Sequence, residues 1–371
     1  MVFAWWRRAA RSARRQAPVA TGSADLYAAA ARTYKNYLDQ GRLPSEHPWI
    51  VHLETRSLCN SKCAFCAAAA NNPDRPTDAL MPEALLDKIF EDLRAIGYAN
   101  RLSFYNNNEP FLDKRIFDIV ARARHKVPGA YLEIKSNGTT LTLDKVVRIF
   151  DAGLDALYIN DYVTDGQPTA SIEALRVQLA KTQRFRGQYT QGRYTGQRIS
   201  IATRGLVDIL NTRAGTAPNR TTLQAPLQVP CFRPFEMMTV NPNGIVSVCS
   251  DDVYFNAAMG NLNERSLLQI WNSERWQEMR RQLLAGNRLF HDLGHTVTFT
   301  GRVESQFRRQ VGAVAVLGLL DLRNFTFTSD LRRWDILSRR SRMPVGFDLN
   351  GFLGFAFLRH RIPTWLLSVY G

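Results

Sequence analysis

The chain contains few cysteines, only 5 among 371 residues. It also lacks an apolar run of the roughly 18 residues that a membrane-spanning helix needs. The longest apolar stretches, 314–320 and 352–358, are short and have arginines nearby. No apolar core follows the arginines at 7–8, so we expect neither a secretory signal nor a twin-arginine export signal. A disulfide framework is therefore not expected, and the thiols should stay reduced.

Acidic residues are also scarce, because 33 Asp and Glu stand against 48 Lys and Arg and leave a net charge of +15. Such a charge favours anionic partners and says nothing about the fold. The paired arginines lie toward the two ends, at 7–8, 14–15, 308–309, 332–333 and 339–340. We expect a solvated face or an anionic membrane surface there. Nucleic acid is not expected, because no basic run interleaved with aromatics occurs in the motif loops described below. The prediction is a cytoplasmic protein, with a peripheral membrane position as the alternative.

Three of the cysteines, Cys59, Cys63 and Cys66, lie in one short segment after the strand-like run 49–55. A Cys-x3-Cys-x2-Cys loop offers three thiolates, whereas a closed site needs four ligands. The open position that results is where a substrate or cofactor binds. Zinc is a simpler interpretation, but it would need a second ligand pair, which His52 alone does not supply. A disulfide fits poorly with a chain for which no export is expected.

From about residue 49 to 205, short β-rich runs alternate with helical patterns, which is typical of a parallel α/β fold. The expected strands are 50–54, 102–105, 131–135, 154–159 and 198–203. The expected helices are 82–93, 115–126, 142–150 and 172–185. Each expected strand ends in a loop with polar residues or cysteines. Because the loops after the strands form the active site of α/β barrels, we expect these loops to converge.

The second half of the chain has a different pattern. Segments rich in Gly, Thr, Gln and Pro predict loops at 187–197 and 212–230. Two β-rich runs joined by Pro-Asn-Gly predict a hairpin at 237–249. Residues 267–284 predict one amphipathic helix that ends near Gly286. The remainder is basic and aromatic, without a motif.

The cysteine loop, with Phe65 before the third cysteine, resembles the signature of the radical S-adenosylmethionine (radical SAM) superfamily. In that family three thiolates hold a [4Fe–4S] cluster, its open iron chelates the amino and carboxylate groups of S-adenosylmethionine, and reductive cleavage gives a 5′-deoxyadenosyl radical. The resemblance covers about residues 49–290. It implies a partial (β/α)6 TIM-like barrel followed by a small α+β domain of the twitch or SPASM type. It also implies a cellular one-electron reductant of the flavodoxin or ferredoxin type.

Two further loops extend the resemblance. Asn107, Asn108 and Glu109, followed by proline, occupy the place of the family's Gly-Gly-Glu-Pro. Asparagine adopts positive φ more readily than most residues and is a tolerable replacement for glycine. The resemblance makes Glu109 an acceptor for the methionine ammonium group. Ser136 and Asn137, followed by glycine, match its Thr-Asn-Gly segment, which suits hydrogen bonds to ribose or carboxylate. The alternative for both loops is an ordinary polar turn.

Five residues are candidates for a role next to the substrate. Asp161 and Tyr162 follow the fourth expected strand and are expected to face the same mouth. Arg204 and Arg213 are candidates to hold a carboxylate or phosphate through a bidentate contact. Asp251 is a candidate base. The alternatives are a surface position for each arginine and a turn position for Asp251.

The other two cysteines, Cys231 and Cys249, resemble the start of a SPASM or twitch domain, which binds an auxiliary cluster. The Cys-x2-Cys pair that normally follows the helix is missing here. The residues at that place that offer substitute ligands are His291, Asp292 and His295. The alternative is that both cysteines are small buried hydrophobic residues. We therefore predict that the scaffold is kept without a complete second cluster.

These observations predict four segments: a basic N-terminal segment (1–48), a radical SAM barrel (49–230), a twitch/SPASM-like domain (231–290) and a basic aromatic extension (291–371). The resemblance implies an oxidoreductase that abstracts a hydrogen atom from a small carbohydrate-like or aminocyclitol-like molecule and oxidises it. Three alternatives remain open: a redox-neutral epimerase, a peptide maturase and a non-catalytic membrane-surface binding protein.

Overall fold

The structure is a computed structural model. It describes residues 31–41, 43, 45–185, 187–190, 193–196, 198–205, 216–218, 230–287, 289–292 and 295–298. The arginine pairs near the two ends lie outside these residues, and so do residues 212–215 and 219–229 of the expected loop 212–230. Among the helices of the described ranges, none has the length and apolar character needed to cross a membrane.

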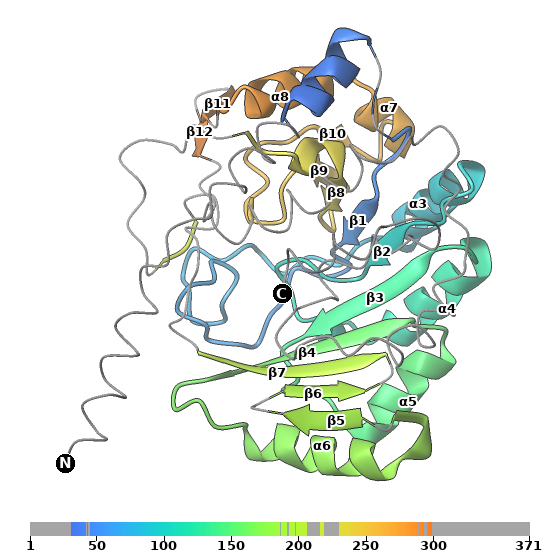
Figure 1. The fold of residues 1–371 in the computed structure, drawn as a ribbon, viewed down its shortest axis with the longest axis vertical. Coiled ribbons are helices and arrows are strands. Elements are labelled where there is room, and N and C mark those ends of the chain that lie inside the picture. Colours follow the sequence, from blue (N-terminus) through green and yellow to red (C-terminus); the bar gives the residue numbers. More distant parts are fainter. Residues whose placement is uncertain are drawn as a thin grey trace, which may run out of the picture.

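Ten strands form one continuous sheet in the order β10-β9-β8-β1-β2-β3-β4-β7-β6-β5 (Figure 1). The strands are β1 Ile50–Leu53, β2 Arg101–Ser103, β3 Tyr131–Ser136, β4 Ala156–Val163, β5 Gly187–Thr190, β6 Arg193–Gly196, β7 Ile199–Gly205, β8 Met237–Val240, β9 Ile245–Ser247 and β10 Gly260–Asn261. The six neighbours from β8 to β7 in this order all pair in parallel. The predicted α/β fold with a parallel sheet is confirmed.

Helices connect the parallel strands and cover one face of the sheet (Figure 1). They are α3 Glu83–Ala95, α4 Ile116–Lys126, α5 Leu143–Asp151 and α6 Ala170–Lys181. Their apolar stripes pack on alternate strand residues, such as Leu102, Leu132 and Leu157, in one core. The strand residues between them point to the other face, which carries Ser103, Glu133 and further polar side chains.

The expected loop at 187–197 is wrong. Strands β5 and β6 form an antiparallel hairpin, and β6 pairs with β7 to extend the sheet. Tyrosine and threonine, which favour strands, recur in this segment. The glycines and glutamines between them are typical of loops, so the sequence did not predict strands here.

The single helix expected at 267–284 is also wrong. The structure has α7 Leu267–Trp271 and α8 Glu274–Leu284, and Ser273 lies between them. The Ser273 side chain accepts a hydrogen bond from the backbone N–H of Trp276 and caps α8. An amphipathic pattern that continues across the break does not reveal a new helix start. The expected end is correct, because Gly286 has a φ of +81° just after α8.

The hairpin predicted at 237–249 is confirmed as β8 and β9, which pair in antiparallel orientation. It does not form a separate sheet. Strand β8 pairs in parallel with β1, with Met238 opposite Val51, so the second half of the chain adds its strands to the barrel sheet. A separate two-stranded sheet consists of β11 Leu289–Asp292 and β12 His295–Thr298.

Candidate active site

The candidate site lies at the carboxyl ends of the parallel strands. The cysteine loop connects β1 to α3, and Figure 1 shows it in blue beside these strand ends. The loop after β2 carries Glu109, and the loop after β3 carries Asn137. Because parallel strands end at the same edge, residues from distant parts of the chain meet here. The predicted convergence of these loops is thus seen in the geometry.

Glu109 is fully buried and connects two of the loops. One carboxylate oxygen accepts from the Ser136 hydroxyl at 2.8 Å and from the Phe111 backbone N–H at 3.2 Å. The other accepts from the Asn137 backbone N–H at 2.7 Å. Burial raises the pKa of Glu109 to about 6, although these hydrogen bonds favour the charged form. A carboxylate has about four acceptor positions, so one remains.

Asn137 joins the cysteine loop to the same group. Its side-chain amide donates to the Asn60 side chain at 2.9 Å and lies 3.8 Å from the Cys59 sulfur. The Asn60 amide in turn donates to Thr139 at 2.8 Å. The backbone N–H of Glu109 donates to the Leu58 carbonyl at 2.8 Å. The loops after β1, β2 and β3 are therefore linked directly to one another.

The three cysteines of the loop are free thiols, with Cys63 buried and Cys59 and Cys66 half-buried. Burial raises the pKa of Cys59 to about 11, so this thiol needs a nearby positive centre to become a thiolate. No set of three Cys, His, Asp or Glu side chains within the described ranges is close enough to hold one metal ion. Three free thiols on one loop match the three thiolates of an iron–sulfur cluster with one open iron, in which each thiolate binds a different iron.

The two asparagines before Glu109 do not use the positive φ that we expected to replace glycine. Their side chains hold the loop instead. Asn108 accepts from the Asn106 backbone N–H at 3.0 Å, and Asn107 donates to the Ser250 carbonyl at 3.2 Å. Asn107 thereby connects this loop to the segment after β9.

The residues proposed near the substrate lie in different surroundings. The Tyr162 ring lies 5.5 Å from the ring of Phe65 in the cysteine loop. Arg204 is exposed on β7 and donates to Asn160 on β4 at 2.8 Å. Asp161 points to the helix side of the sheet, where both carboxylate oxygens accept from Thr169 before α6.

The remaining two candidates are Arg213 and Asp251. Arg213 lies outside the described residues. Asp251 forms an ion pair with Arg233 at 3.2 Å, in the second half of the chain.

The face of the sheet that the helices do not cover is called the inner face below. Several of its polar residues were not predicted from the sequence to be part of the site. Glu133 accepts from Ser103 at 2.8 Å and from the Tyr105 hydroxyl at 3.0 Å. The ammonium group of Lys135 lies 4.8 Å from the centre of the Tyr105 ring and 5.9 Å from that of Tyr158. The alternation of polar and apolar residues along β2 and β3 was the available signal.

The inner face carries the cations Arg101 and Lys135 beside the carboxylate of Glu133. Burial raises the pKa of Glu133, but Arg101, Lys135 and the Ser103 hydrogen bond outweigh it and lower the net value. Burial, together with the positive charge of Arg101, lowers the pKa of His52 to about 3, so this imidazole is neutral. Lys135 is exposed while Glu133 is buried, so the accessible charge is positive.

Cys231 and Cys249 are both buried. The Arg233 guanidinium lies 2.9 Å from the Cys249 sulfur and also contacts Ser250 at 3.2 Å. Burial raises the pKa of Cys249 to about 12, even though Arg233 lowers it. A cation therefore stands beside the sulfur. The residues proposed as substitute ligands belong to two strands: His291 and Asp292 to β11, and His295 to β12.

Comparison with known proteins gives matches to two family descriptions. Residues 54–160 match the radical SAM superfamily, and residues 231–291 match an iron–sulfur cluster-binding domain, SPASM. A curated relative from Niallia circulans, S-adenosyl-L-methionine-dependent 2-deoxy-scyllo-inosamine dehydrogenase, is 23% identical over 244 residues. The match covers 66% of this chain and 90% of the relative.

A solved structure has the same fold. The crystal structure of BtrN in complex with AdoMet and 2-DOIA aligns with a TM-score of 0.54 at 23% identity, and the alignment covers 65% of this chain and 89% of BtrN. The motif loops, their convergence at the strand ends and the two family matches agree. Residues 54–160 therefore form a radical SAM domain and residues 231–291 a SPASM-type domain, which supports an enzyme that uses a [4Fe–4S] cluster and S-adenosylmethionine.

Proposed function

We propose that this enzyme oxidises a hydroxyl-bearing carbon of a small polyhydroxylated substrate of the aminocyclitol class. The observation that carries the proposal is the junction of the three loops through Glu109 and Asn137, next to a polar, tyrosine-rich inner face. The curated relative, named as a dehydrogenase of 2-deoxy-scyllo-inosamine, supports the substrate class and the direction of the reaction.

In this proposal Cys59, Cys63 and Cys66 hold the cluster. When bound, the cluster and S-adenosylmethionine supply a radical that removes a hydrogen atom from an unactivated C–H bond. Glu109 uses its remaining acceptor position for the ammonium group of the methionine. Ser136 and Asn137, which Glu109 fixes, orient the ribose or carboxylate.

The inner face is the proposed substrate surface. Tyr105, Tyr158 and Tyr162 offer hydroxyl groups and flat apolar rings, a combination that suits the two kinds of surface on a hydroxylated ring. Lys135 and Arg204 are exposed there and offer donors to substrate oxygens. Asp161 is proposed only as a positioning residue, because Thr169 occupies both of its oxygens.

The direct test is anaerobic reconstitution, followed by incubation with S-adenosylmethionine, a chemical reductant and 2-deoxy-scyllo-inosamine. We expect one 5′-deoxyadenosine for each product molecule that has lost two hydrogens by mass. A product of unchanged mass that takes up deuterium from solvent would indicate epimerisation instead. No substrate-dependent 5′-deoxyadenosine would contradict a role with this substrate.

Two variants test the substrate surface. Tyr105→Phe removes the hydroxyl that donates to Glu133 and should lower kcat/KM for the substrate while leaving S-adenosylmethionine affinity unchanged. Tyr37→Phe, at a half-buried tyrosine in the helical segment 31–39, is the matched control. If both variants lower kcat/KM equally, the inner face is not the substrate surface.

We propose further that the second half of the chain binds no complete second cluster, although its family description implies one. It contributes only Cys231 and Cys249, and the chain has no further cysteine outside the cysteine loop. The one-electron reductant and the anionic membrane surface are kept as predicted partners.

A further inference from the structure

The cysteine loop is closed at its base by a short neck. Backbone contacts pair its two ends: an isolated antiparallel bridge between Arg56 and Leu80, Ser57 N–H to the Ala79 carbonyl at 2.9 Å, and Met81 N–H to the Thr55 carbonyl at 2.9 Å. All three cysteines lie between these ends. The position of the thiols therefore depends on how this neck is held.

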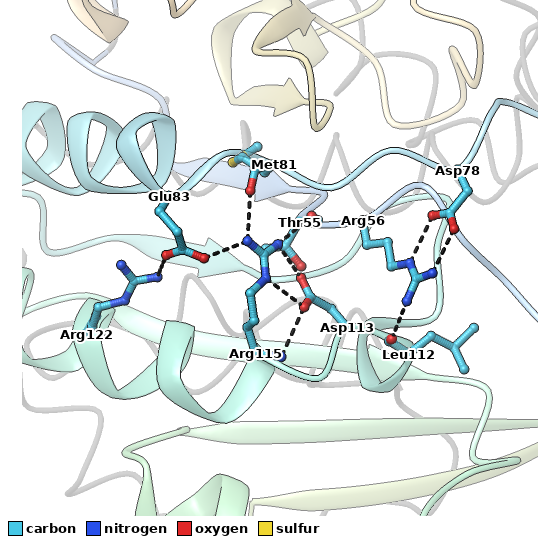
Figure 2. Close-up of polar contacts among 9 residues, drawn as sticks. All are labelled: Thr55, Arg56, Asp78, Met81, Glu83, Leu112, Asp113, Arg115 and Arg122. Atoms are coloured by element: carbon cyan, nitrogen blue, oxygen red, sulfur yellow. Dashed lines mark hydrogen bonds and ion pairs between the residues drawn. The ribbon is translucent and has the colours of Figure 1, made fainter.

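Arg56 strengthens the neck and connects it to a second loop (Figure 2). Its guanidinium makes a bidentate contact with Asp78, at 2.9 and 2.7 Å, across the neck. Its third nitrogen donates to the Leu112 carbonyl at 2.8 Å. Leu112 ends the short helix η1 Pro110–Leu112, which directly follows Glu109.

Arg115, which follows η1, also connects the neck to the segment after Glu109 (Figure 2). It binds the buried Asp113 through two nitrogens, at 3.0 and 2.9 Å. It also donates to the carbonyls of Met81 at 3.0 Å and Thr55 at 3.4 Å, and to Glu83 at 2.6 Å. Arg115 thus contacts both ends of the neck, the start of α3 and the segment after Glu109.

We propose that Arg56 and Arg115 are positioning residues that fix the cysteine loop relative to Glu109. A guanidinium is planar and always charged, so one side chain can bind a carboxylate and a carbonyl in fixed directions at the same time. Lysine cannot replace this geometry, because its charge is a single point. The two arginines set the distance between the thiols that hold the cluster and the carboxylate proposed for the methionine ammonium group.

The inference rests on the proposed roles of the cysteines and Glu109, so its test needs one measurement that does not depend on iron. The variants are Arg56→Ala and Arg56→Lys. The control is Arg122→Ala, which also removes ion pairs with Glu83 and Asp87 but does not contact the neck. Melting of the iron-free proteins by circular dichroism checks that all variants fold.

The first measurement is hydrogen exchange at the amides of Ser57 and Met81 in the iron-free protein. Arg56→Ala should lower their protection about fivefold, the ratio that corresponds to about 1 kcal/mol for a partly exposed ion pair. Arg56→Lys should restore only part of it, and Arg122→Ala should change nothing. Unchanged protection in Arg56→Ala, or equal loss in Arg122→Ala, would overturn the role of Arg56 in closing the neck.

The second measurement is the change that S-adenosylmethionine causes in the electron paramagnetic resonance spectrum of the reduced cluster. Arg56→Ala should need about fivefold more S-adenosylmethionine for half of this change, at equal iron content. Wild-type behaviour of Arg56→Ala would overturn the positioning role. If the wild-type protein binds no iron at the cysteine loop, the proposed function fails, while the exchange measurement still decides whether Arg56 closes the neck.

Discussion

Replacing Glu109 by glutamine should separate cofactor binding from folding. The glutamine has the same size, but its amide nitrogen cannot accept the hydrogen bond from Asn137. Loss of a hydrogen bond to a charged group costs about 1.5–3 kcal/mol. Against this, burial raises the pKa of Glu109 from 4.5 to about 6. This shift of about 1.5 units means that ionised Glu109 costs about 2 kcal/mol relative to its protonated form.

The two effects nearly cancel in the folding free energy at pH 8. Between about pH 4.5 and 6, Glu109 holds a proton in the folded protein but has lost it in the unfolded chain. The stability of the wild-type protein therefore falls as pH rises through this window. Glu109→Gln should remove this dependence and melt within about 4 °C of wild type at pH 8. The ammonium contact has no such compensation, and its loss should weaken S-adenosylmethionine binding about 10- to 150-fold.

Calorimetric titration of the reconstituted protein with S-adenosylmethionine measures the affinity, and circular dichroism gives the melting temperature. Glu173→Gln, which removes only a contact with Arg176 on α6, is the control and should bind like wild type. Wild-type affinity in Glu109→Gln would refute the role of this carboxylate. A large loss of stability at pH 8 would refute the compensation argument.

Three further predictions concern other parts of the described structure. Burial raises the pKa of Glu54 to about 7, so the folded protein binds a proton there between about pH 4.5 and 7 and loses stability as pH rises; Glu54→Gln should flatten this slope in urea denaturation at pH 5 and 8. Gly138→Ala should cost about 2–4 kcal/mol in the same assay, because φ is +78° and a Cβ would lie 2.6 Å from Ile172 and 2.7 Å from Ile159; an unchanged midpoint would contradict this. Iron analysis should give about four irons per chain, and almost none when the three cysteines of the loop are replaced by alanine; a full cluster in that variant would instead place iron in the second half of the chain.

Much of the fold was predictable because the parallel strands are short β-rich runs separated by amphipathic helices. The hairpin of β5 and β6 was not, because its glycines and glutamines resemble a loop and its strand character depends on pairing with β7. The break before Ser273 was missed for the opposite reason, since the apolar pattern continues across it.

The site was predictable where a motif marks the residues. Cys59, Glu109 and Asn137 are far apart in sequence, and the structure brings their loops together. Asp161 shows where sequence order fails. Strand β4 continues to Val163, so Asp161 belongs to the strand, and alternation turns it toward α6. Lys135 and Tyr105 carry no motif, and only the pairing of β2 and β3 shows that they share a face.

The parallel pairing of β8 with β1 means that the barrel and the SPASM-type domain share one hydrogen-bonded unit. A chain ending at Pro230 would leave β1 as an edge strand, and the backbone groups of Ile50 to Leu53 that pair with β8 would be open to pairing with another molecule. Such edges promote aggregation, so we expect that the N-terminal part cannot be isolated as a soluble fragment. One side of β1 pairs with β2, but its other side can pair only when a strand nearly 190 residues later in the chain arrives.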